Sequence, residues 1–190
     1  MKGYRPKRQQ QREFEIERTA SIVDDIIGEQ EAVRALDLTG YKNHVFRMVN
    51  FCFAFDELST EEEEKIILAG CFHDIGIWTA ETFDYIPPSI DAALEQLKRV
   101  NRTDWSEQIA QMIGEHHKIR RIKTDKLTEI FRKGDLVDFS LGTMKCGLDP
   151  SFVKDVKARF PNCGFHAGLL RTAAKWIVRH PLNPVPVIKW

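Results

Sequence analysis

Six histidine and aspartate residues could together bind a metal ion, because each is predicted on a helix face that is otherwise apolar. Imidazole nitrogens and carboxylate oxygens are both good ligands for zinc, manganese, iron, cobalt or magnesium. Burying a carboxylate costs free energy unless it is paired or bound to a cation, and a metal ion would be such a cation. The six predicted ligands are His44, His73, Asp74, His116, His117 and Asp135.

The adjacent pair His73-Asp74 ends an apolar helical run that begins at Ile66. Neighbouring side chains on a helix point about 100° apart, so the two residues continue two different inward rows. No Lys or Arg lies within a helical turn of the pair. Taken alone, the pair is better explained by a histidine satisfied in the core and an aspartate that caps a helix end. The coincidence with four other inward ligand-type residues favours a metal site.

Apolar positions at helical spacing predict the helices that must position these residues, and the sequence has no strand pattern and no internal repeat. The predicted fold is therefore all-α, a single helical bundle. Helix-capping patterns mark several of the predicted starts. These patterns are Thr60-x-x-Glu63, Ser89, Asp104-x-x-Glu107 and Asp149-Pro150. The predicted helices cover about 41–56, 60–74, 89–100, 104–118, 125–141, 150–160 and 165–180, with two shorter helices within 13–35.

The overall composition predicts one cytoplasmic domain. A chain of 190 residues with 43% hydrophobic content can bury one proper core. The balance of 28 basic and 28 acidic residues argues against an extended nucleic-acid or membrane footprint. The four cysteines show no CxxC spacing, which suits free thiols in a reducing compartment, and no export signal or membrane span is evident. We expect a flexible arm at 1–12, a domain at 13–180 with its motif core at 40–140, and an extended tail at 181–190.

Two segments near the predicted ligands could take part in binding. The basic residues Lys118, Arg120 and Arg121 follow the histidine pair, and they could form a phosphate clamp or a solvated helix end. The loop predicted at 76–88 carries three aromatic residues. It could be a lid, although aromatic loop residues more often pack the segment down.

The chain resembles the HD-domain metal-dependent phosphohydrolase superfamily, whose pattern is a first His, a later His-Asp pair and a final Asp on successive helices. In this chain these positions match His44, His73-Asp74 and Asp135, and the resemblance spans about residues 40–140. It implies a helical bundle of the HD type that holds one or two divalent metal ions. Members with a second metal commonly place extra histidines between the pair and the last Asp, where His116 and His117 fall. Which of these two is a ligand stays open.

The resemblance implies hydrolysis of a nucleotide or another small phosphoester by a metal-activated water. Asp74, His116 and His117 would be catalytic, and the basic residues after them would bind phosphate. The catalytic glutamate of the mononuclear nucleotidases and the Gly-Tyr-Pro motif of the cyclic-dinucleotide phosphodiesterases have no counterpart here. Two alternatives stay open: a di-iron oxygenase in the same fold, and a non-catalytic nucleotide-binding or sensor domain. A homo-oligomer is also compatible with the sequence.

Overall fold

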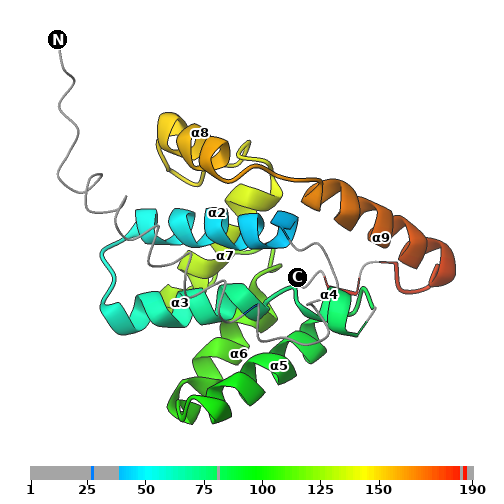
Figure 1. Cartoon of the computed structure of the whole chain (residues 1–190), viewed down its shortest axis with the longest axis horizontal. Coiled ribbons are helices and arrows are strands. Elements are labelled where there is room, and N and C mark those ends of the chain that lie inside the picture. The colour runs from blue at the N-terminus through cyan, green and yellow to red at the C-terminus, as the bar shows by residue number, and fades with distance from the viewer. Residues whose placement is uncertain (1–26, 28–38, 81, 185, 188–190) are drawn as a thin grey trace.

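The computed structural model describes residue 27 and residues 39–80, 82–184 and 186–187, and all regular structure within them is helical (Figure 1). This confirms the all-α prediction. In chain order the elements are α2 (Thr39–Phe55), α3 (Thr60–Phe72), α4 (Gly76–Thr79), α5 (Ile86–Arg99), η2 (Thr103–Trp105), α6 (Ser106–Glu115), α7 (Lys126–Phe139), α8 (Pro150–Arg159) and α9 (Phe165–Arg179). None of these helices is both long and apolar enough to cross a membrane.

The amino-terminal predictions lie outside the described residues. The expected arm at 1–12 and nearly all of the expected helices at 13–35 fall in this part of the chain. The exception is Ile27, which is helical and buried in the core.

Helix α2 is the centre of the bundle, because α3, α7, α8 and α9 all contact it (Figure 1). Its buried residues lie on every side of the helix, as expected for a central element. They include three polar residues, His44, Arg47 and Asn50. The helix therefore carries polar groups into the middle of an apolar core, where they need partners from the neighbouring helices.

A glycine in α7 allows that helix to pack very closely on α2. A Cβ atom at Gly134 would collide with Cys52 Sγ and would lie 2.9 Å from the carbonyl oxygen of Met48. Only glycine avoids both contacts without a shift of the backbone. Asp135 is the next residue along α7, so this close approach brings its carboxylate to the surface of α2.

Helix α3 is capped by Ser59, one residue before the predicted cap Thr60. The Ser59 Oγ accepts a hydrogen bond from the Glu62 N–H at 3.3 Å, and Glu62 Oε2 accepts one from the Ser59 N–H at 2.7 Å. Serine is a somewhat better cap than threonine, but both are common there and both positions have a glutamate three residues later, so the capping-box pattern fits either one. At its far end α3 stops at Phe72, and His73 is the C-cap residue.

Helix α5 starts earlier than predicted, because it accommodates Pro87 and Pro88 in its first turn. Ser89 therefore lies inside the helix and does not cap it. Its Oγ instead accepts a hydrogen bond from the Gly76 N–H at 3.0 Å, which ties α5 to the start of α4. The predicted loop at 76–88 thus contains a short helix and the beginning of another.

The predicted capping box at Asp104 is also wrong. Asp104 lies within the short 3-10 helix η2, and α6 begins at Ser106 without a side-chain cap. Helix α6 ends at Glu115, before the predicted end at 118. His116 and His117 consequently lie in the turn that follows the helix.

The remaining helices follow the sequence prediction. Helices α7 and α8 begin after Asp125 and Asp149, whose carboxylates accept hydrogen bonds from the first-turn N–H groups of their helices. Helix α9 covers the predicted amphipathic segment. Beyond it, residues 181–184 and 186–187 form turns and bends, and the other residues of the tail that we expected at 181–190 lie outside the described part of the chain. Val187 is buried there beside Ile77, Tyr85 and Ile86.

Replacing Gly134 with alanine should lower the free energy of unfolding by about 1–3 kcal/mol, because the added methyl group overpacks the contact with α2. The gain of about 1 kcal/mol in helix propensity does not offset a clash with a backbone carbonyl. Gly168→Ala in α9 is the matched control, since nothing lies within 4 Å of its Cβ position. Chemical denaturation should show that this control is as stable as wild type or slightly more stable. Equal effects of both changes would contradict the close contact.

Candidate metal centre

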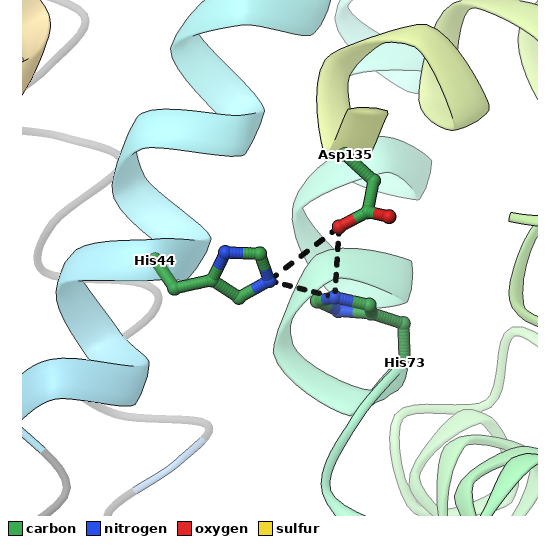
Figure 2. Close-up of side chains that lie close together, drawn as sticks. All are labelled: His44, His73 and Asp135. Carbon is green, nitrogen blue, oxygen red and sulfur yellow. Dashed lines mark hydrogen bonds and ion pairs between the residues drawn. The ribbon is translucent and has the colours of Figure 1, made fainter. Parts of the chain in front are cut away.

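Three predicted ligands from three different helices meet at one point (Figure 2). His44 comes from α2, His73 from the end of α3 and Asp135 from α7, and all three side chains are buried. The Asp135 Oδ1 lies 3.6 Å from His44 Nε2 and 3.7 Å from His73 Nε2. The two Nε2 atoms lie 2.9 Å from each other. These are separations at which three atoms can share one cation.

The hydrogen bonds on the far side of each ring decide what the two Nε2 atoms can do. His73 Nδ1 donates to the carbonyl oxygen of Gly70 at 2.8 Å, and His44 Nδ1 donates to Asp138 Oδ2 at 2.7 Å. With the hydrogen on Nδ1, a neutral imidazole has only a lone pair on Nε2. Two lone pairs at 2.9 Å repel each other and cannot form a hydrogen bond. A cation between them, or an added proton, removes the repulsion.

A second pair of ligand atoms lies beside the first group. His116 Nε2 and Asp74 Oδ1 are 3.5 Å apart, and within the described structure both are buried atoms without a hydrogen-bond partner. His116 Nδ1 lies 2.7 Å from the Ile113 carbonyl oxygen and donates to it, so its Nε2 also presents a lone pair. Buried polar atoms are rarely left unpaired, which indicates a ligand at this position. The observed donors therefore fit a divalent metal ion.

All six predicted ligands belong to one cluster in the described part of the chain. Three sets of three residues each offer ligand atoms that lie within 4.8 Å of one another. The sets share members, which allows two neighbouring metal positions as well as one. They are His44, His73 and Asp135; His73, Asp74 and His116; and His116, His117 and Asp135.

The charges in this cluster stabilise one another. Burial by itself would lower the pKa of the His73 imidazole, but the carboxylates of Asp74 and Asp135 outweigh it and raise that pKa to about 9. Burial would raise the pKa of Asp74, yet the histidines His73 and His116 hold it well below its usual value. The pKa of Asp135 is lowered against its burial in the same way. A bound metal would replace the proton on His73.

Two residues that the sequence analysis left without a role orient His44. The Asp138 carboxylate accepts hydrogen bonds from His44 Nδ1, from Arg47 Nε at 2.5 Å and from Arg47 Nη2 at 2.8 Å. Burial would raise the pKa of Asp138, but these partners lower it well below its usual value. Arg47 follows His44 by three residues and Asp138 follows Asp135 by three, so each pair shares a helix face. That repeated spacing is the signal that could have identified them.

Tyr85, at the start of α5, contacts the second residue of the pair His116-His117. Its hydroxyl oxygen lies 2.6 Å from His117 Nε2, and Tyr85 itself is buried. His117 therefore has one ring nitrogen already engaged, whereas His116 presents an unpaired Nε2 to Asp74. Phe83 also lines the cavity beside the site, and Trp78 packs on Tyr41 in the core, so the aromatic residues of the 76–88 segment pack it down, as one of the two interpretations expects.

A cavity of about 590 Å³ opens on the cluster. Only one of the three predicted phosphate-binding residues lies in its wall. Lys118 lines this cavity. Arg120 is exposed and is not among the lining residues, and Arg121 lines a different depression, next to Phe55. Arg132 also lines the cavity and was missed, although its guanidinium is bound to the Glu129 carboxylate.

Comparison with known proteins assigns the chain to a family. The family model described as HD domain matches residues 41–147, which is more than half of the 190-residue chain and includes all six predicted ligands. No curated protein and no solved structure matches the chain.

Loading the chelator-treated protein with a divalent transition metal should raise its melting temperature, because the ion binds only the folded cluster. At 100 times the dissociation constant the folded state gains about 2.7 kcal/mol. Asp135→Asn should lose most of this shift and most of the bound metal in elemental analysis. Asp155→Asn, which changes an exposed aspartate of α8, should keep both. A full shift in Asp135→Asn would contradict a role for this carboxylate as a ligand.

Asp138→Asn should weaken metal binding by about 10–100-fold without removing a ligand, because the neutral amide holds the His44 Nδ1–H less firmly than a carboxylate does. Competition with a chromophoric chelator measures this affinity, and circular dichroism checks that the variant is folded. Asp91→Asn on the exposed face of α5 is the control. An unchanged affinity in a folded variant would mean that Asp138 serves only to pair Arg47.

Proposed function

Because the chain belongs to the HD domain family, we propose that it is a metal-dependent phosphohydrolase that acts on a small phosphoester. One observation carries the proposal. The buried Nε2 atoms of His44 and His73 face each other across 2.9 Å with their Nδ1 atoms hydrogen-bonded elsewhere, at the base of a cavity large enough for a small organic molecule. A proton on His73 would join these two nitrogens, but it would leave His116 Nε2 and Asp74 Oδ1 beside them without a partner, whereas a metal ion would serve all of these atoms.

We assign the ligand role to His44, His73, Asp74, His116 and Asp135. A divalent metal held by these residues would polarise a phosphoryl oxygen and lower the pKa of a water molecule that attacks phosphorus. The protein's contribution is to hold the ligand atoms in place before the substrate arrives. Fixed Nδ1 hydrogen bonds orient all three of the histidine ligands toward the same space.

The residues around the metal site have separate tasks in this proposal. His117 is placed by its contact with Tyr85 and lines the cavity, so we assign it to the phosphate or the leaving oxygen and not to the metal. Lys118 lies at the cavity wall, 3.3 Å from Glu115, and could turn its ammonium group toward a bound phosphate. The ligand side chains are themselves buried, which limits their contact with bulk water to the side that faces the cavity.

Replacing His73 with alanine should lower kcat/KM for phosphate release by more than about 100-fold, since even residues that only orient metal ligands contribute 10–100-fold. The assay uses metal-loaded protein and a panel of phosphomonoesters, phosphodiesters and nucleotides, with released phosphate measured by colour. His180→Ala, which changes an exposed histidine after α9, is the control and should retain wild-type activity.

Three results would contradict the proposal. Equal activity of His73→Ala and wild type would mean that any phosphate release does not depend on the cluster. Turnover that stops without oxygen would favour the di-iron oxygenase alternative. Tight binding of a panel member without product, after prolonged incubation with metal, would favour a non-catalytic sensor.

A further inference from the structure

The cavity above the candidate metal centre has most of its polar groups at its base. Five of the six predicted ligands form that base, all except His73. The walls come from the α6–α7 segment, α7, the loop after it and α9, with contributions from Phe83, Tyr85 and Val187. Six of the wall residues are large hydrophobic side chains that are nevertheless exposed to solvent. They are Ile119, Phe139, Leu141, Met144, Leu170 and Ile177.

These exposed residues are concentrated at the cavity. The described structure has nine large hydrophobic residues with exposed side chains, and only Val100, Val178 and Leu182 lie elsewhere than on the cavity wall. Single exposed hydrophobic residues are ordinary, but a cluster of them around one opening is typical of a binding surface. We call these six residues the apolar rim.

The polar groups on the wall already have partners. His166 Nε2 donates to the Asp138 carbonyl oxygen at 3.0 Å, and Arg132 is bound to Glu129 through two hydrogen bonds of 2.8 Å. No described residue that lines the cavity is an Asn, Gln, Ser or Thr, and its only carboxylates are Asp74 and Asp135 of the cluster. A nucleobase buried here would leave its hydrogen-bonding edge unpaired, which disfavours its binding.

We propose that the substrate is a phosphomonoester of an apolar alcohol, with its phosphate at the metal centre and its hydrocarbon group against the apolar rim. This inference rests on the proposed function and narrows its substrate class away from nucleotides. In the reaction, the oxygen of water bonds to phosphorus as the bond between phosphorus and the alkyl oxygen breaks. One hydrogen of the water leaves on the alcohol, and the other stays on the hydrogen phosphate.

Binding of n-alkylphosphonates tests the inference without turnover, because their carbon–phosphorus bond is not hydrolysed. Calorimetry with metal-loaded protein compares chains from ethyl to octyl with a nucleoside 5′-phosphonate. Each added methylene should tighten binding by about twofold to fourfold, as expected for partial to full burial of a methylene group. The nucleoside phosphonate should bind no more tightly than the ethyl compound.

Two matched variants of α9 test whether the alkyl group of the phosphonate binds at the apolar rim. Leu170→Gln changes a residue of the apolar rim that is 72% exposed, and Val178→Gln changes a residue of the same helix that is 82% exposed and outside the cavity. Leu170→Gln should weaken octylphosphonate by about threefold to tenfold and leave ethylphosphonate unchanged, because only the longer chain reaches this position. Val178→Gln should change neither.

A flat chain-length series, or tighter binding of the nucleoside phosphonate, would overturn the inference even if the protein releases phosphate from other esters. A graded series without hydrolysis of the matching alkyl phosphates would support the apolar ligand class and remove the proposed function. If Leu170→Gln converts a dimer into a monomer with unchanged phosphonate binding, the apolar rim is a contact between copies of the chain and the inference is overturned.

Discussion

The main constraint on this fold is the burial of mutually dependent charges at the junction of α2, α3 and α7. Neither the carboxylates nor the lone pairs of the histidines would be stable there alone, since the surrounding core is apolar. They are tolerated because each group is held by another from a distant part of the chain: Asp138 is 91 residues from Arg47 and 94 from His44. A metal ion would complete this mutual stabilisation, which makes the polar centre a cost of function and not a source of stability.

Much of the fold was predictable, because local patterns determine it. The helices that contain His44 and Asp135 and the one that ends before His73 follow from apolar periodicity, and the cap Asp149 follows from residue type. The errors arose where two local signals competed. Ser59 and Thr60 are both followed by a glutamate at the right distance, and the start of α5 at Pro87 and Pro88 was mistaken for a loop.

The sequence predicts which ligand-type residues make up the candidate site, but it does not predict how they contact one another. Periodicity places Asp135 on an inward face, but it does not say which helix that face meets. The partnership of Arg47 with Asp138 and the contact of Tyr85 with His117 depend on tertiary packing, so only the structure reveals them. The basic run after the histidines shows the same limit, because Lys118 and Arg121 are only three residues apart but line different depressions of the surface.

The position of Val187 has a consequence for the order of events during translation. All the ligands of the candidate centre and their orienting partners lie between His44 and Asp138, so the ribosome supplies them first. Part of the cavity wall comes from α9 and from Val187, which are synthesised later. The candidate centre is therefore synthesised before part of the wall that would shape its specificity, so its residues leave the ribosome earlier than α9 and Val187.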